Sequence, residues 1–118
     1  MNKVTSIVVN NTYADIKEIS DIEKQKQCWL GKDKNYVSSF DEVMCRLFDD
    51  NDFDSFVDKT SKEIGLSKEV ITELIKLRFL LNSYLEKGTD EEIIQDIEWH
   101  KVSNQAKKVI ELWVLKKI

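Results

Sequence analysis

Hydrophobic residues recur at helical spacing along most of the chain, in stretches separated by short polar segments. Phe40, Val43, Met44 and Leu47 follow an i, i+3, i+4, i+7 pattern. They come directly after Ser39, a residue type that caps helix N-termini by accepting a backbone hydrogen bond. This stretch therefore predicts a helix that begins after Ser39 and buries one face.

The longest apolar pattern follows Ser67, another N-cap residue, and runs to about Lys87, before Gly88. Its apolar positions cover more than half of the helix circumference, which is typical of a helix surrounded by other elements. We expect this segment to be the central, mostly buried helix. Its apolar residues are Val70, Ile71, Leu74, Ile75, Leu77, Leu80, Leu81, Tyr84 and Leu85.

Shorter patterns and cap signals predict four further helices. The last of them has alternating apolar and lysine-rich faces, with Ala106, Val109, Ile110, Trp113 and Val114 inward and Lys107, Lys108, Lys116 and Lys117 outward. The four helices run from Tyr13 to about Gln27, from about Phe53 to Glu63, from the capping box Thr89-Asp90-Glu91-Glu92 to about Trp99, and from Ser103 onward.

The fold class follows from these patterns and from the scarcity of turn residues. The sequence has no proline and three glycines, which favours helices joined by short connections. Residues 1–10 are ambiguous between a strand and an ordered arm, because Val8-Val9 favours β structure and the flanking Asn10-Asn11 favours neither. We expect an all-α, compact single-domain bundle of about five to six helices over residues 1–118, with the option of a short extended N-terminal arm.

Composition and length indicate the number of domains and the cellular location that we expect for this protein. A length of 118 residues suits one domain, and no run of apolar residues is long enough for a membrane span. The apolar patch at Ile7-Val8-Val9 is too short for a signal peptide, so we expect a cytoplasmic protein. Cys28 and Cys45 lack C-x-x-C spacing and are expected to be reduced core thiols. With His100 they supply three ligands, whereas a structural zinc site takes four.

The acidic segment after Asp49 partly matches a calcium-binding loop. Counted from Asp50, carboxylates occupy loop positions 1, 3, 5 and 9. Position 6 is Ser55 where the turn requires glycine, and position 12 is Ser61 where a bidentate glutamate is required. We therefore expect no calcium site, and instead an inter-helix loop with a capping aspartate or an acidic protein-binding patch.

Other candidate chemistry is equally incomplete. Glu92, Asp96 and His100 would share one face of a continuous helix and offer an acid–base pair or metal ligands, but Glu92 is also explained by the capping box. The sequence contains no G-x-S-x-G motif and no phosphate-binding glycine loop. These observations predict a protein that is not an enzyme and that needs no cofactor.

The distribution of charge suggests a protein partner. Between Ser38 and Asp58 there are seven acids against Arg46 alone, whereas five lysines and one acid follow from Lys101 onward. A net charge of −4 disfavours nucleic acid, and a concentrated acidic face suits a basic protein instead. The candidate contact residues are Glu42, Asp49, Asp50, Asp52, Phe53, Asp54 and Asp58, with Phe53 included in case its ring is exposed.

One part of the chain resembles bacterial toxin-immunity proteins, in particular the small immunity proteins of contact-dependent growth inhibition systems. The resemblance is carried by Gln27-Cys28-Trp29-Leu30-Gly31, Tyr36-Val37-Ser38-Ser39-Phe40-Asp41-Glu42-Val43 and Leu47-Phe48-Asp49-Asp50-Asn51. It implies a cytosolic protein that binds and blocks the toxin domain of a secreted partner, frequently a nuclease with a basic active site. The alternatives are a helical antitoxin-like, regulatory or adaptor protein whose acidic face is incidental, and an enzyme or metal-binding module that uses His100.

Overall fold

The computed structural model describes residues 2–117, with side chains described as far as Trp113. This part of the chain is helical throughout its regular structure and contains no strand, so the predicted all-α fold is confirmed. None of its helices combines the length and the apolar character needed to cross a membrane. The side chains of Val114, Lys116 and Lys117, which we assigned to two faces of the last helix, lie outside the described residues.

The described chain contains more helical elements than we expected, because two expected helices are broken and two contain π-helical turns. The π turns η1 and η2 continue the neighbouring α-helices without interruption. In chain order the elements are α1 (Lys3–Ile19), α2 (Ile22–Trp29), α3 (Phe40–Cys45), η1 (Arg46–Asp50), α4 (Phe53–Ser55), η2 (Phe56–Thr60), α5 (Ser61–Glu63), α6 (Lys68–Ser83), α7 (Asp90–Gln95) and α8 (Ile97–Lys117).

The extended N-terminal arm is a wrong prediction, because α1 already begins at Lys3. Asn2 is the N-cap, and its side-chain oxygen accepts a hydrogen bond from the backbone N–H of Thr5 at 2.8 Å. Val8 and Val9 lie in the middle of this helix. Their β preference is a context-dependent tendency, which the cap and the packing of α1 override.

The helix expected from Tyr13 to Gln27 is also interrupted, at the corner between α1 and α2. Asp21 caps α2 by accepting a hydrogen bond from the N–H of Lys24 at 3.0 Å. Gln25 is fully buried, and its side-chain N–H groups donate to the carbonyl oxygens of Glu18 and Ile19, both at 2.9 Å. These bonds satisfy carbonyls that the end of α1 leaves without helical partners, which stabilises the corner.

Three predicted boundaries in the second half of the chain are wrong. The helix expected to be central and mostly buried, α6, lies instead beside α8 with an exposed outer side, and it ends at Ser83 instead of Lys87, because Tyr84 has an extended backbone with ψ of 129°. The next helix ends at Gln95 instead of Trp99, and α8 begins at Ile97. Ser103, the expected start of the last helix, is a buried residue within α8.

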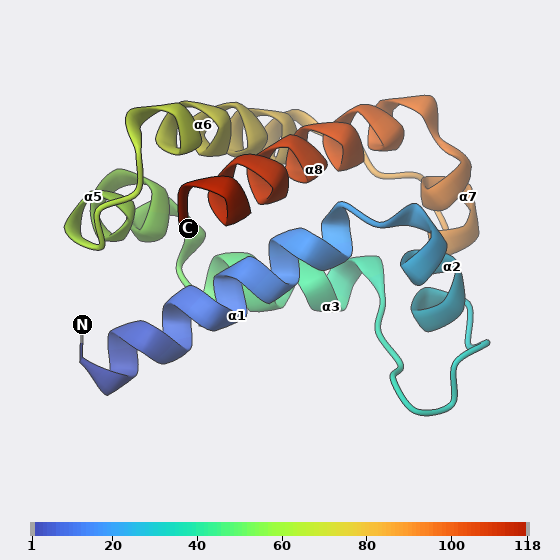
Figure 1. Ribbon diagram of the computed structural model, residues 1–118. Coiled ribbons are helices and arrows are strands. Elements are labelled where there is room, and N and C mark those ends of the chain that lie inside the picture. Colours follow the sequence, from blue (N-terminus) through green and yellow to red (C-terminus); the bar gives the residue numbers. More distant parts are fainter. Residues whose placement is uncertain (1, 118) are drawn as a thin grey trace.

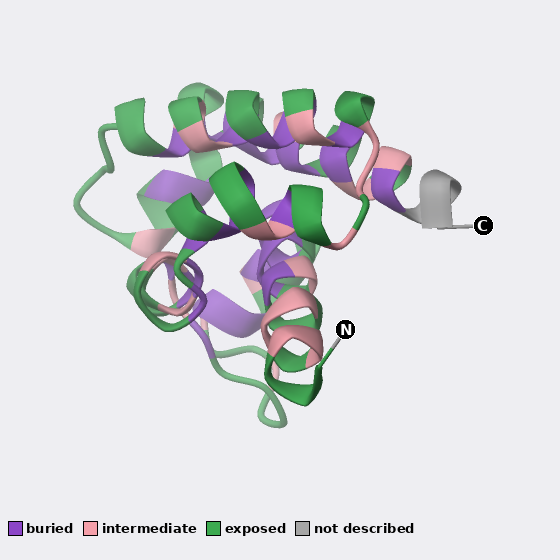
Figure 2. Cartoon of the chain, turned by 90° about the vertical axis from the view of Figure 1, so that its left-hand side faces the viewer, coloured by how far each residue is buried: buried purple, intermediate pink, exposed green. Residues whose placement is uncertain are grey.

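The helices pack around α8, which lies beside α6 and also contacts α1 (Figure 1). The α3–η1 segment packs on α1, and α2 meets α7 at one end of the molecule. Buried residues lie on the inward sides of the helices and exposed residues on the outer sides (Figure 2). This arrangement leaves the predicted acids of α3, η1, α4 and η2 exposed at the surface of the bundle.

Aromatic side chains fill the interior near α8. Trp99 is completely buried, and its ring lies within 6.0 Å, centroid to centroid, of those of Trp29, Phe40 and Tyr84. Its indole N–H donates to the side-chain oxygen of Gln25 at 2.8 Å, so α8 is linked to the α1–α2 corner. Trp113 is buried as well, and the expected core positions of these two tryptophans are confirmed.

Candidate partner-binding surface

Six of the seven predicted contact residues are carboxylates at exposed positions, and we call these six the acidic face. Phe53 differs from them, because its side chain is completely buried. Its ring packs edge-on against the ring of Phe48, with 5.5 Å between the ring centroids. Its inclusion as a contact residue is therefore wrong, and its role is to anchor this segment to the core. The acidic face consists of Glu42, Asp49, Asp50, Asp52, Asp54 and Asp58.

The turn at Asp52 determines how this segment meets the core. Asp52 has a φ of 46°, in the left-handed region that aspartate and asparagine tolerate better than most residues. Its side chain also accepts a long hydrogen bond from the N–H of Ser55 at 3.4 Å and so caps α4. The turn leaves Asp52 and Asp54 exposed while Phe53, between them, points into the core.

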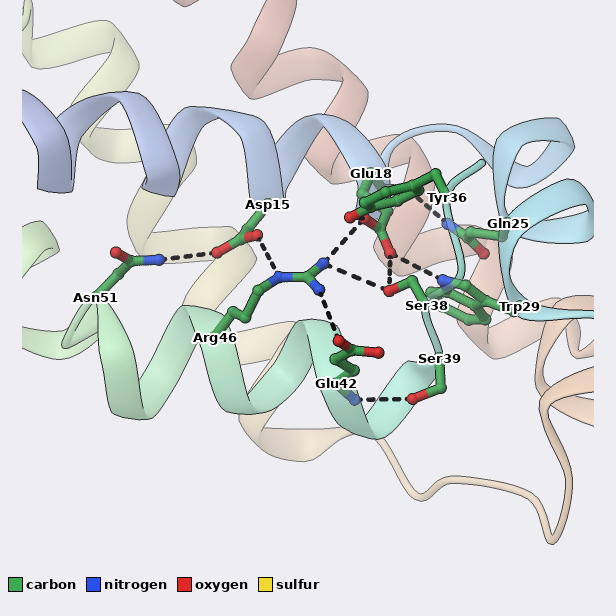
Figure 3. A network of polar contacts seen from close by, with 10 residues as sticks. All are labelled: Asp15, Glu18, Gln25, Trp29, Tyr36, Ser38, Ser39, Glu42, Arg46 and Asn51. Atoms are coloured by element: carbon green, nitrogen blue, oxygen red, sulfur yellow. Dashed lines mark hydrogen bonds and ion pairs between the residues drawn. The ribbon is translucent and has the colours of Figure 1, made fainter. Parts of the chain in front are cut away.

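Arg46 is the single cation between Ser38 and Asp58, and its guanidinium points toward carboxylates of α1 (Figure 3). Its Nε lies 3.1 Å from Oδ1 of Asp15, and its Nη2 lies 2.9 Å from Oε1 of Glu18. A longer contact of 3.6 Å joins Nη1 to Glu42 of the acidic face. One positive charge is thus shared among three carboxylates, two of which are buried.

Glu18 is only 4% exposed and collects donors from several segments. Its carboxylate accepts hydrogen bonds from the indole N–H of Trp29 at 2.9 Å, the hydroxyl of Tyr36 at 2.7 Å and the hydroxyl of Ser38 at 2.8 Å. Burial and the neighbouring carboxylate both raise the pKa of Tyr36, so its hydroxyl remains a donor. These bonds hold the polar segment between α2 and α3 against the end of α1, as Figure 3 shows.

Asp15, the second buried carboxylate, is held by Arg46 and by the side-chain amide of Asn51, which donates to it at 2.8 Å. Burial raises the pKa of Asp15, and the hydrogen bond and charge of Arg46 offset this effect only in part. Burial alone would lower the pKa of Arg46, but its hydrogen bond to Asp15 and the charge of Glu18 raise it above the usual value. Arg46 therefore stays charged, and its charge is used inside the protein.

A second arginine, Arg78 of α6, contacts the other end of the acidic face. Its Nη1 lies 2.9 Å from Oδ1 of Asp58 and 3.7 Å from Oδ1 of Asp54. The arginine side chain is 21% exposed, whereas both aspartate side chains are more than 60% exposed. Sequence reasoning missed this contact because Arg78 is 20 residues away from Asp58 in the chain.

The side chains of Asp49 and Asp50 have no hydrogen bond or ion pair with any described residue. They belong to η1, and η2 contains Asp58, so both π turns contribute to the acidic face. Such turns are rare in proteins, and those that exist are frequently found at functional sites. The acidic face therefore has six exposed carboxylates, two of which lack any partner in the described chain.

The alternative site at Glu92, Asp96 and His100 is not formed as expected, because the helix breaks at Asp96. Asp96 accepts a hydrogen bond from the hydroxyl of Tyr84 at 2.8 Å, and Nε2 of His100 lies 2.6 Å from the carbonyl oxygen of Ile94. Among the described residues, no group of three or more histidine, cysteine, aspartate or glutamate side chains is placed to hold a metal ion.

The two cysteines are free thiols in different environments. Cys28 is buried, as expected for a core thiol, and burial raises its pKa. Cys45 is exposed on α3, so its expected place in the core is wrong. The difference arises because the continuous α3–η1 segment turns Val43 and Leu47 toward the interior and Cys45 away from it.

Comparisons with protein-family models, curated proteins and solved structures find no match to this chain. The likeness to immunity proteins is carried by residues 27–31, 36–43 and 47–51.

Proposed function

We propose that this chain is a non-enzymatic binding protein of the immunity type, which captures a basic protein domain on its acidic face and blocks it. The observation that supports the proposal most strongly is the inward position of Arg46. The one cation between Ser38 and Asp58 is bound to buried Asp15 and Glu18, so it leaves Asp49 and Asp50 of the acidic face without a side-chain partner among the described residues.

Such a face is suited to fast recognition of a basic partner. Complementary charge can raise association rates of proteins from about 10⁵–10⁶ to 10⁸ M⁻¹s⁻¹ or more at low salt. A toxin domain that cleaves nucleic acid needs a basic site for phosphates, and exposed carboxylates compete for the same cations. Asp49 and Asp50 suit this role best, because neither is engaged by another described side chain.

The proposal is tested by co-expressing the chain with the protein encoded beside its own gene. We expect that neighbour to be basic and toxic when expressed alone, and the chain to restore growth and to bind it in a one-to-one complex measured by calorimetry. A neighbour that is harmless to cells and is not bound by the purified chain would overturn the proposal.

Charge variants test the role of the acidic face in that complex. Replacing Asp49 and Asp50 with asparagine should slow association by about tenfold at low salt and reduce its salt dependence. The matched control replaces Glu86 and Glu111 with glutamine, which removes the same charge from exposed positions outside the acidic face. Equal association rates for the two double variants would show that overall charge, and not the acidic face, governs the encounter.

A further inference from the structure

The outer side of α6 exposes apolar residues that the sequence pattern assigned to the core. Phe79 is 69% exposed and Ile75 is 48% exposed, while Ile71 is half-buried one turn earlier. Residues spaced by four lie on one side of a helix, so these three form a continuous apolar ridge. The expectation that Ile75 is buried is wrong, because α6 contacts other elements through the side that carries Leu74 and Leu77.

This ridge lies directly beside the acidic face. Arg78 precedes Phe79 and follows Ile75 by three positions, so its side chain leaves α6 along the edge of the ridge. From there it reaches Asp54 and Asp58, as described above. Two exposed carboxylates and one arginine therefore border the ridge on this side, with a net negative charge.

The opposite side of the ridge carries a cation that is already neutralised. Lys76 lies 3.1 Å from Glu73, which is buried and also bound by Lys108 at 3.2 Å. Gln105 donates a further hydrogen bond to the same carboxylate at 3.2 Å. These contacts direct Lys76 toward α8, so the charge beside Phe79 comes from Asp54, Asp58 and Arg78, which together carry one net negative charge.

We propose that Ile75 and Phe79 are the apolar anchors of the partner contact: the ridge of α6 enters an apolar groove of the basic protein, whose lysine or arginine side chains meet Asp54 and Asp58. This inference rests on the proposed function and adds a second part to its surface. Aromatic anchors surrounded by polar groups provide most of the binding energy in many interfaces, and paired residues four positions apart are a common form of helix recognition. A second copy of this chain is a poorer occupant, because it would bring its own carboxylates toward Asp54 and Asp58.

The inference is tested with the purified complex between this chain and the basic protein encoded beside its gene. Replacing Phe79 with alanine should weaken binding by about 30-fold or more, mainly through faster dissociation. Replacing Ile75 with alanine should have a smaller effect in the same direction. Leu85→Ala and Ile97→Ala are matched controls, because both remove exposed apolar side chains outside the ridge and should leave binding unchanged. Thermal unfolding of all four variants should match that of the wild type.

The possible outcomes separate this inference from the function on which it rests. A wild-type complex that Phe79→Ala leaves unchanged would overturn the anchor role and leave the proposed function intact. Failure of the wild-type chain to bind the basic neighbour would overturn both. Sedimentation of the chain alone provides a further check, since a dimer that Phe79→Ala dissociates would assign the ridge to a second copy.

Discussion

The Nη2 atom of Arg46 lies 2.9 Å from Oε1 of Glu18, a contact between residues 28 positions apart that joins η1 to the last turn of α1. The same guanidinium bonds Asp15, one turn earlier on α1. Arg46 therefore stabilises the junction of two helices while the acids that follow it in sequence remain at the surface. Loss of Arg46 should therefore reduce the stability of the fold more than it changes the acidic face.

Arg46→Ala should lower the free energy of unfolding by about 3–5 kcal/mol, because it leaves two buried carboxylates without their cation. Urea unfolding followed by tryptophan fluorescence provides the measurement. Lys59→Ala is a suitable control, since Lys59 is exposed on η2 and has no ion pair within the described chain. A loss below about 1 kcal/mol for Arg46→Ala would contradict the stabilising role of the network.

Leu77 in the middle of α6 and Leu85, two residues beyond its end, provide a test of the core. Leu77→Ala should cost about 2–5 kcal/mol, because Leu77 is completely buried and its truncation leaves a cavity. Leu85→Ala makes the same chemical change at a residue that is 87% exposed and should change stability by less than about 0.5 kcal/mol. Similar midpoints of denaturant unfolding for the two variants would be inconsistent with this position of α6.

Because the backbone of Asp52 is left-handed, we expect alanine at this position to destabilise the protein more than asparagine does. Asp52→Ala should destabilise the protein by about 1–2 kcal/mol, because alanine is strained at this φ and removes the cap of α4. Asp52→Asn should be almost neutral, since asparagine tolerates this conformation and retains an oxygen acceptor. Thermal unfolding of the two variants provides the measurement. If alanine is tolerated as well as asparagine, the turn at Asp52 is not left-handed in solution.

Glu73 predicts a specific pH dependence of stability. Burial alone would raise the pKa of Glu73, but hydrogen bonds from Gln105, Lys76 and Lys108 lower it below the usual value near 4.5. The ionised group therefore stabilises the fold above pH 4.5, and this contribution is lost as the pH falls through the pKa of the folded state. The difference in unfolding free energy between wild type and Glu73→Gln should be largest near neutral pH and should shrink in acid. A difference that grows in acid would contradict the lowered pKa.

The sequence predicted the helix starts that are determined by an N-cap residue next to the helix. Ser39, Ser67 and Thr89 each cap a helix in the structure, as their positions before apolar patterns indicated. The breaks at Ser20 and Asp96 were missed, because the apolar periodicity of one helix continues into the next across them. Tertiary contacts, such as the bonds of buried Gln25 to the last carbonyls of α1, stabilise these breaks together with local caps such as Asp21.

The acids of the candidate surface were visible in the sequence, whereas their partners were not. Asp54 and Asp58 were identified from composition alone, but their pairing with Arg78 depends on how α6 packs against η2. Glu18 was missed for a similar reason, although its position between Ile16 and Ile19 on an apolar stripe was an available signal. The charge pattern of the sequence thus indicates where acids are concentrated, and packing decides which of their carboxylates are paired with an arginine.

The position of Arg46 also has a consequence for how this protein can change over evolutionary time. The bonds that hold α1 to η1 involve residues whose replacement is costly, whereas the side chains of Asp49 and Asp50, in the same π turn, bond to no described residue. Substitutions at these two positions should therefore accumulate with little penalty to folding. A lineage that encountered a new partner would be able to alter its recognition there, one residue at a time, without first acquiring compensating mutations in the interior.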